Sequence, residues 1–221
     1  MAPAPAGLVR ALSAAASALE GSADELNRLD GYAGDGDLGI TMSEAARAVK
    51  DALAASQDQE AAQLLSTCGA GIARKAPSTS GTLVATGFLR AAKAVAGSNG
   101  HGVDILEQAF VAALGGIQAR GKAAVGDRTL VDGLDAVCTS LRESLQAGRG
   151  LGEALHFAAA AASGATDKTV DMEPKVGRAS WVPQRAIGHP DAGCAMLAIA
   201  LTAAAAEVTA AGPGTRPGLI C

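Results

Sequence analysis

Apolar residues recur at intervals of three and four along the 221-residue chain. This spacing puts them on one face of an α-helix, whereas a half-buried strand would show alternation, and no segment alternates over a sustained length. Hydrophobic residues make up 49% of the chain and aromatic residues only 2%, so much of the apolar content is alanine. Small helix-forming residues favour closely packed helices. The sequence therefore predicts an all-α fold with essentially no sheet.

Eight segments carry the helical spacing, and we expect each of them to form one helix. Short, plain connections between some of these segments favour antiparallel neighbours, so we predict a single domain, spanning residues 1–221, of eight up-and-down helices. The expected helices cover residues 8–19, 42–53, 61–72, 84–95, 106–117, 130–145, 151–162 and 197–208.

Local signals mark where some of these helices begin. Thr41 with Glu44, and Thr129 with Asp132, have the spacing of a capping box at a helix start. Residues 22–25 suggest a short extra turn after the first helix.

The distinctive sequence lies in every second connection. The links after the second, fourth and sixth helices are short and plain, around residues 56–57, 97–100 and 148–150. In an up-and-down bundle, alternate links lie at the same end, so we expect the other four to converge there. Each leads into a helix N-terminus, where free N–H groups and the helix dipole favour anions. We call these four the first loop (residues 30–39), the second loop (74–81), the third loop (120–128) and the fourth loop (168–193).

The first loop gathers three carboxylates within eight residues, Asp30, Asp35 and Asp37, with glycines between them. Glycine allows the tight backbone that such convergence needs. Converging carboxylates repel unless one holds a proton or a cation lies between them. Oxygen ligands without His or Cys suit Mg²⁺ or Ca²⁺ better than Zn²⁺, and Mg²⁺ sites often also bind phosphates. We therefore expect a magnesium–nucleotide site, the alternative being an ordinary Asp/Gly turn.

Two known motifs fail at the first loop. Gly34, Gly36 and Gly39 match the dinucleotide fingerprint, but no strand precedes them and two aspartates would repel a bare pyrophosphate. An EF-hand starting at Asp35 needs Glu at its twelfth position, which is Ala46.

The other loops allow a phosphate role and a plain structural role side by side. Thr79 and Ser80 in the second loop offer hydroxyl and N–H groups, or simply cap a helix. In the third loop the spacing from Gly116 to Lys122 nearly matches a P-loop, but Ala123 replaces the required Ser or Thr. The third-loop glycines either cover a nucleotide as a flap or end a helix.

The fourth loop offers charged groups with a similar ambiguity. Arg178 suits phosphate through its forked guanidinium, or is an ordinary solvated arginine. Asp191 either caps the last helix or contacts a ribose. His189 precedes proline and is more typical of a structural histidine than of an acid–base group. Trp181, the single tryptophan, lies near the expected site.

Bulk properties narrow the function classes. The net charge is −4 and no basic run is present, so nucleic acid is not an expected partner. The four cysteines are far apart and form no C-x-x-C pair, which favours a reduced, cytoplasmic protein. No secretory signal is evident, and the uncharged span 192–206 is better interpreted as a buried helix than as a membrane helix, so no membrane association is expected.

Together the loops resemble the nucleotide-binding L subunit, or L domain, of dihydroxyacetone kinases. The matching stretches occur in the family's order and run from about residue 24 to about residue 205. They are residues 29–30 with 34–39, 80–81, 126–132, 177–180 and 191–193.

The resemblance implies an all-helical barrel of eight antiparallel helices with the nucleotide site at one end. It implies two Mg²⁺ ions on Asp30, Asp35 and Asp37, and ADP or ATP bound by residues from all four loops. Arg178 is the candidate catalytic residue. The implied nucleotide contacts are Leu38, Gly39, Ile40, Thr41, Thr79, Ser80, Gly121, Leu130, Arg178, Asp191, Ala192 and Gly193.

The resemblance also implies a function in trans. The chain contains no convincing base for a substrate hydroxyl, and in the family a separate K subunit or domain holds the ketone on a histidine. We therefore expect phosphoryl transfer to dihydroxyacetone or a related short hydroxyketone. The donor is either a phosphotransferase-system protein or ATP. Ala76-Pro77-Ser78 departs from the family's glycine-rich approach to the second loop, which leaves the substrate open. The alternative is a regulatory module that binds nucleotide and docks on a kinase partner or transcription factor without turnover.

Overall fold

A computed structural model describes residues 4–55, 59–96 and 98–210 of the chain. Within these ranges the regular structure is entirely helical, with no strand. The all-α prediction is therefore confirmed. The elements are α1 (Ala6–Gly21), α2 (Ala23–Asp30), α3 (Leu38–Ala54), α4 (Ala61–Lys75), α5 (Thr79–Ala96), α6 (Val103–Gly121), α7 (Leu130–Gln146), α8 (Leu151–Lys168), η1 (Thr169–Asp171), η2 (Arg178–Trp181), α9 (Pro183–Ala186) and α10 (Ala192–Ala210).

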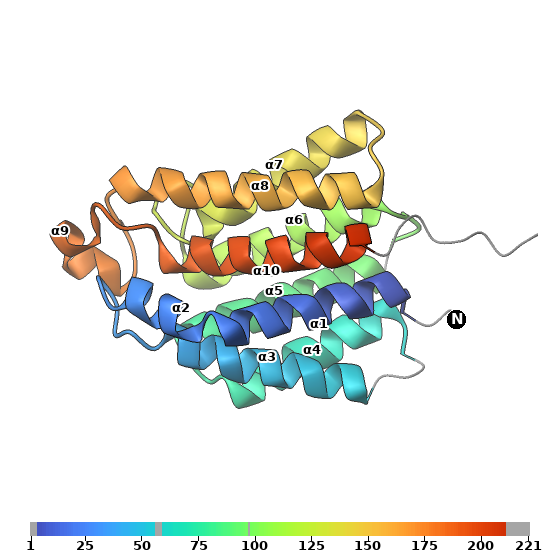
Figure 1. Cartoon of the computed structure of the whole chain (residues 1–221), viewed down its shortest axis with the longest axis horizontal. Helices are drawn as coiled ribbons and strands as arrows, with labels where there is room; N and C mark the ends of the chain where they lie inside the picture. The colour runs from blue at the N-terminus through green and yellow to red at the C-terminus, as the bar shows by residue number, and fades with distance from the viewer. Residues whose placement is uncertain (1–3, 56–58, 97, 211–221) are drawn as a thin grey trace, which may run out of the picture.

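The eight long helices close into a ring, in the order α1, α3, α4, α5, α6, α7, α8 and α10, with α10 packed against α1. Each long helix contains one of the eight predicted segments. Figure 1 shows the helices running along the long axis of the molecule, with α2 and α9 at one end. The predicted barrel of eight up-and-down helices is therefore confirmed, and α2 accounts for the extra turn expected at residues 22–25.

Alanine allows these helices to pack closely. On α8 the buried residues Ala154, Ala158 and Ala162 lie four apart, each fully buried, and they form one core cluster with Val137 and Leu141 of α7. A second cluster joins α1, α3, α4 and α5. Because a methyl group adds little width, the α8 backbone approaches its neighbours closely, and most of its helix stability comes from this packing.

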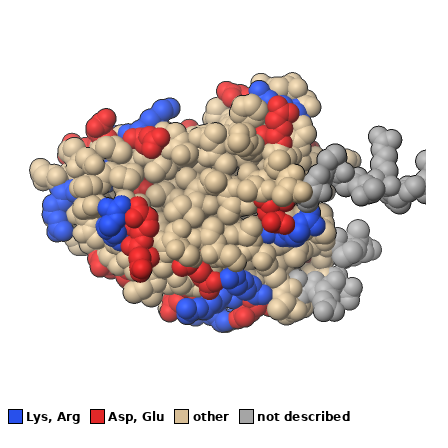
Figure 2. Space-filling model, in the orientation of Figure 1, with Lys and Arg blue, Asp and Glu red and all other residues tan. Residues whose placement is uncertain are grey.

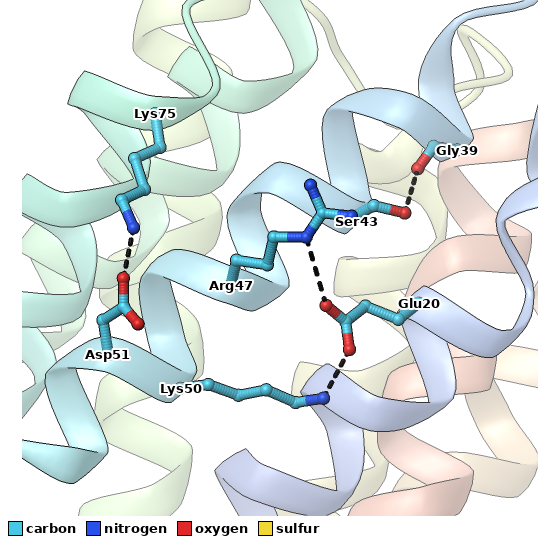
Figure 3. A network of polar contacts seen from close by, with 7 residues as sticks. All are labelled: Glu20, Gly39, Ser43, Arg47, Lys50, Asp51 and Lys75. Carbon is cyan, nitrogen blue, oxygen red and sulfur yellow. Dashed lines mark hydrogen bonds and ion pairs between the residues drawn. The ribbon is translucent and has the colours of Figure 1, made fainter.

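Ion pairs connect neighbouring helices at the surface of the barrel. Glu20 of α1 pairs with Lys50 and, at 3.7 Å, with Arg47, both on α3, while Asp51 of α3 pairs with Lys75 of α4 (Figure 3). These side chains are substantially exposed, so each pair contributes only about 0–1 kcal/mol. The apolar clusters, not these pairs, account for most of the stability of the barrel.

Helix α10 is long and apolar enough to cross a membrane by length and composition, but 44% of its most apolar stretch is buried inside the barrel. A core helix of a soluble protein passes the same test, so this is weak evidence for a membrane span. On the face shown in Figure 2, charged side chains form separate groups with a broad uncharged surface between them. Part of α10 thus packs in the core, as the sequence led us to expect.

One predicted helix start is confirmed and one is wrong. Thr129 and Asp132 form a complete capping box at the start of α7. Thr41 and Glu44 do not form one, because α3 begins three residues earlier, at Leu38, and Thr41 already lies inside the helix. The predicted link at residues 56–57 falls outside the described residues, as does residue 97 of the predicted link 97–100.

Candidate functional site

The four distinctive loops emerge at the end of the barrel where α2 and α9 lie (Figure 1). An apolar cluster of α2, α3 and α10 includes Leu38 and Ala192, which lie at the ends of the first and fourth loops. Its buried members include Leu26 and Met42, both fully buried, and Leu38 at the start of α3. Fully burying a side chain of this size stabilises the fold by about 1.5–3 kcal/mol. The ends of α2, α3 and α10 that carry the first and fourth loops are therefore tightly packed against one another.

The first loop brings its three carboxylates together. One oxygen atom from each of Asp30, Asp35 and Asp37 can be chosen so that all lie within 4.8 Å of one another. Asp35 and Asp37 are exposed, and Asp30 is half-buried. Three hard oxygen ligands on the surface, with no nitrogen or sulfur among them, fit the coordination preferences of Mg²⁺.

Asp30 also organises the loop that carries the other two aspartates. Its Oδ2 atom accepts hydrogen bonds from the N–H groups of Gly36 at 2.9 Å and Asp37 at 3.1 Å. Its Oδ1 atom lies over Gly34, where a Cβ atom would come within 2.2 Å of it. Glycine at position 34 is therefore a steric requirement of the carboxylate arrangement.

The fourth loop delivers a positive charge to the same place. The guanidinium of Arg178 forms an ion pair with Asp35, and more than half of the Arg178 side chain is exposed. Two more contacts join the fourth loop to the first: Arg185 donates to the Gly31 carbonyl at 3.3 Å, and the His189 ring stacks on the Tyr32 ring. The ring centroids are 3.4 Å apart and the planes differ by 5°. Arg178 is thus next to the carboxylate cluster.

The hydroxyl-bearing second loop meets the start of α3 through Ser78. The Thr41 hydroxyl donates to the Ser78 Oγ at 3.3 Å, and this oxygen also accepts the Gly81 N–H at 3.0 Å. Ser78 therefore caps α5, which leaves the side chains of Thr79 and Ser80 free of that role. The sequence predicts nucleotide contacts at Thr79 and Ser80 and assigns no role to Ser78.

The third and fourth loops meet at the starts of α7 and α10. Asp191 accepts the Cys194 N–H at 2.8 Å and so caps α10. A Cβ on Gly193 would lie 3.2 Å from the Leu130 Cβ, so these two predicted nucleotide residues are in contact. Leu130 packs in the same apolar cluster as Leu38 and Ala192. Gly121 ends α6 and lies against Leu83 of α5 instead.

Arg128 is a buried arginine within the matching stretch 126–132, and the sequence predicts no role for it. It donates to the Thr169 carbonyl at 2.9 Å, the Ala186 carbonyl at 2.8 Å and the His189 carbonyl at 2.7 Å. It is 4% exposed and adopts a left-handed backbone conformation, φ 60°. Burial lowers the pKa of Arg128 from its ordinary value, partly offset by the charge of Asp191. Arg128 thereby fixes both ends of the fourth loop.

Burial shifts the pKa values of one carboxylic acid at the site and of three thiols. Burial raises the pKa of Asp191 from 3.8, against the opposing effects of the Cys194 N–H and Arg128. Burial raises the pKa of Cys68 to about 11, and Cys138 and Cys194 are also buried free cysteines with raised pKa values. These three thiols therefore stay protonated and are poor nucleophiles.

An eight-helix barrel whose site is built from the interhelical loops of one end defines a distinct class of all-α domain. Residues 32–206 match the DAK2 domain, and the chain belongs to this family. The chain is 34% identical over 168 residues to DhaL, the ADP-binding subunit of the PEP-dependent dihydroxyacetone kinase of Escherichia coli. That match covers 76% of this chain and 80% of DhaL.

Longer kinases and a solved structure show the same similarity. The D-erythrulose kinase of Mycolicibacterium smegmatis is 34% identical and human triokinase/FMN cyclase is 36% identical. These matches cover 91% and 87% of this chain, but only 35% and 33% of the relatives. The dihydroxyacetone kinase of C. freundii in complex with AMP-PNP and Mg²⁺ superposes with a TM-score of 0.74 at 26% identity. That superposition covers 93% of this chain and 34% of the kinase.

Proposed function

We propose that the chain is the nucleotide- and Mg²⁺-binding L subunit of a dihydroxyacetone kinase. In this proposal it transfers a phosphoryl group to dihydroxyacetone or a related short hydroxyketone held by a separate K subunit. The convergence of Asp30, Asp35 and Asp37 beside Arg178 carries the proposal. Membership of the DAK2 family and the similarity to an ADP-binding subunit support it.

Each group of site residues has a distinct role in this proposal. The three aspartates hold two Mg²⁺ ions, which supply positive charge to the phosphates of ADP or ATP when bound. Arg178 turns its guanidinium toward the transferred phosphoryl group and offsets its negative charge. Thr79 and Ser80 donate to phosphate oxygens, and Thr41 does so when its hydroxyl turns from the Ser78 Oγ to the phosphate.

The remaining predicted contacts surround the rest of the nucleotide. Residues 38–40, Gly121, Leu130 and residues 191–193 form this part of the pocket. Of these, Leu130 is only partly buried where it packs against the cluster of Leu38 and Ala192, and it offers an apolar surface to an adenine ring.

Exposed apolar side chains at the loop end support docking of a K subunit. Ile40 is 58% exposed, Val125 53%, Trp181 79% and Ile187 48%. All four belong to the site loops or to the first turn of α3. Apolar groups gathered around a site are typical of a protein interface. A partner that covers them would exclude water from the phosphoryl group during transfer.

The test is calorimetric titration of the protein with ADP and with ATP, in the presence and absence of Mg²⁺. We expect Mg²⁺-dependent binding that Asp35→Asn or Asp37→Asn weakens by at least about tenfold, with unchanged helical content. Asp51→Asn is the matched control, because Asp51 lies on α3 but pairs with Lys75 on the side of the barrel. Equal nucleotide affinity in all four proteins would reject the metal assignment.

The phosphoryl donor can be identified by native mass spectrometry of the freshly purified protein. Co-purified ADP with two Mg²⁺ ions would indicate a tightly held cofactor that a phosphotransferase-system protein rephosphorylates. Protein without nucleotide that binds ATP on addition of Mg²⁺ would indicate an exchangeable substrate. Turnover with an added K subunit and dihydroxyacetone then tests the reaction itself.

A further inference from the structure

Helix α3 is capped by a side chain from another helix. Asp37 occupies the N-cap position of α3, yet its side chain makes no capping hydrogen bond. The N–H groups of Gly39 and Ile40 donate instead to the Oδ1 atom of Asn27 on α2, at 2.7 and 3.3 Å. These are the second and third residues of α3, whose N–H groups an N-cap side chain normally binds. Asn27 therefore takes over the capping role of Asp37.

Close packing of α2 on α3 makes this possible. A Cβ atom on Gly39 would lie 1.9 Å from the Ala23 carbonyl oxygen, so only glycine allows the two backbones to approach so closely. Leu26, next to Asn27 on α2, is fully buried in the cluster that contains Leu38. The Asn27 amide is thus presented to the start of α3 by a firmly packed helix.

The consequence concerns the carboxylate of Asp37. Aspartate is among the preferred N-cap residues, so an Asp37 without Asn27 nearby would turn its carboxylate to the N–H groups of its own helix. With Asn27 on those groups, the Asp37 carboxylate remains in the cluster with Asp30 and Asp35. We propose that Asn27 is a positioning residue that caps α3 in place of Asp37 and so keeps the Asp37 carboxylate available to the metal. This inference rests on the proposed metal site.

The same hydrogen bonds refine how α3 meets a nucleotide. The N–H groups of Gly39 and Ile40 are engaged by Asn27, and the Thr41 N–H donates to the Asp37 carbonyl at 3.0 Å. Phosphate contacts at residues 39–41 would therefore require the Thr41 hydroxyl to leave the Ser78 Oγ, because the N–H groups are engaged. Asn27 thus occupies the N–H groups at the start of α3 and leaves the Asp37 carboxylate for the metal.

The experiment measures binding of Mn²⁺, as a probe for Mg²⁺, by electron paramagnetic resonance without nucleotide. We expect Asn27→Ala to weaken Mn²⁺ binding by about tenfold or more, the range seen when partners that orient metal ligands are removed. Asn27→Asp keeps the capping oxygen and should bind Mn²⁺ at least as tightly as the wild type. Val137→Ala, a core truncation in the middle of α7, controls for a general loss of stability and should leave Mn²⁺ affinity unchanged.

A double-variant cycle separates positioning from general damage. In an Asp37→Ala background no carboxylate remains to be diverted, so adding Asn27→Ala should change Mn²⁺ affinity less than twofold. An equal loss in both backgrounds, or a wild-type affinity in Asn27→Ala alone, would overturn the inference.

Thermal unfolding without metal tests the capping exchange independently of the proposed function. Because either residue can cap α3, Asn27→Ala with Asp37→Ala should lower the melting temperature by more than the sum of the two single variants. Additive single effects would overturn the exchange. A wild-type protein that binds no Mn²⁺ but shows this cooperative loss would reject the metal site and retain the capping exchange.

Discussion

The first loop and the fourth loop meet at the same end of the barrel, but they are held in place by different means. The carboxylate cluster of the first loop is held by local contacts, the hydrogen bonds from Gly36 and Asp37 to Asp30, six and seven residues away. The fourth loop is fixed by Arg128, which reaches carbonyl groups 41 to 61 residues further along the chain. Between these anchors, Arg178 and Trp181 remain exposed.

This difference matches the separate roles that the two loops have in the proposed function. A metal cluster needs its ligands in place before the ion arrives, and short-range hydrogen bonds provide that order. In the proposed function Arg178 follows the transferred phosphoryl group and needs freedom, which its surface ion pair with Asp35 allows. Such a pair contributes only about 0–1 kcal/mol and is easily exchanged for a phosphate.

The largest expected effect comes from the anchor of the fourth loop. Arg128→Ala removes three hydrogen bonds to buried carbonyl groups and should lower the free energy of unfolding by about 3–5 kcal/mol. The stability of Arg128→Lys should lie between those of the wild type and Arg128→Ala, since an ammonium group lacks the fork that reaches several acceptors. Urea unfolding measures both. Arg185→Ala is the matched control, an exposed arginine of the same loop whose loss should cost less than about 0.5 kcal/mol.

If Arg128→Ala unfolded within about 1 kcal/mol of the wild type, the fourth loop would not depend on this residue, and the contrast between the two loops would fail.

The second prediction concerns the first loop. Gly34→Ala places a methyl group where the Oδ1 atom of Asp30 now lies, so the carboxylate must move and Mg²⁺ affinity should fall by at least about tenfold. Calorimetry with Mg²⁺ measures this loss. Gly164→Ala, in α8 with open space around its Cβ position, should bind Mg²⁺ normally and gain roughly 0.5–1 kcal/mol of stability. Normal Mg²⁺ affinity in Gly34→Ala would argue against Asp30 as a ligand.

The features that the sequence predicted correctly are those set by local segments and by chain order. Apolar spacing located all eight long helices, and alternation of plain and distinctive links predicted which loops lie together, because both are properties of local segments and chain order. The predicted roles of Asp30, Asp35, Asp37 and Arg178 remain predictions, although the structure brings these residues together.

The contacts that the sequence did not reveal join distant residues. Asn27 caps a helix that begins 11 residues later, at Leu38. The helix therefore starts before Thr41, where the sequence predicted the cap. The stacking of Tyr32 on His189 joins the first and fourth loops, and no local pattern marks either partner. Such contacts depend on how α2, α3 and α10 pack, which apolar spacing does not specify.

The third prediction tests the freedom of Arg178. Arg178→Ala should weaken Mg-nucleotide binding by about tenfold, corresponding to about 1.4 kcal/mol, and leave unfolding within about 0.5 kcal/mol of the wild type. Arg178→Lys should restore only part of the affinity, because a lysine contacts phosphate as a single point charge. Calorimetry and urea unfolding on the same samples separate the two quantities. A large loss of stability would show that Arg178, like Arg128, anchors the loop.

The smallest expected effect is a pH dependence at Asp191, where the fourth loop enters α10. Burial raises the pKa of Asp191 above its unfolded value of 3.8, so the ionised carboxylate costs free energy in the folded state. This cost is absent below pH 3.8 and grows as the pH rises through the folded pKa. Asp191→Asn keeps an oxygen that accepts the Cys194 N–H and cannot ionise. The stability of Asp191→Asn relative to the wild type should therefore increase from about pH 4 to pH 7.

The gain in unfolding free energy of Asp191→Asn over the wild type should stay below about 1 kcal/mol, because Arg128 and the Cys194 N–H offset part of the burial cost. Urea unfolding at pH 4, 5.5 and 7 measures the difference, with the exposed Asp24→Asn as control. A relative stability that falls with pH would mean that attraction by Arg128 outweighs burial. Arg128 would then hold the fourth loop through its charge as well as through its three hydrogen bonds. The loop that carries the exposed Arg178 would then depend on the attraction between Arg128 and Asp191.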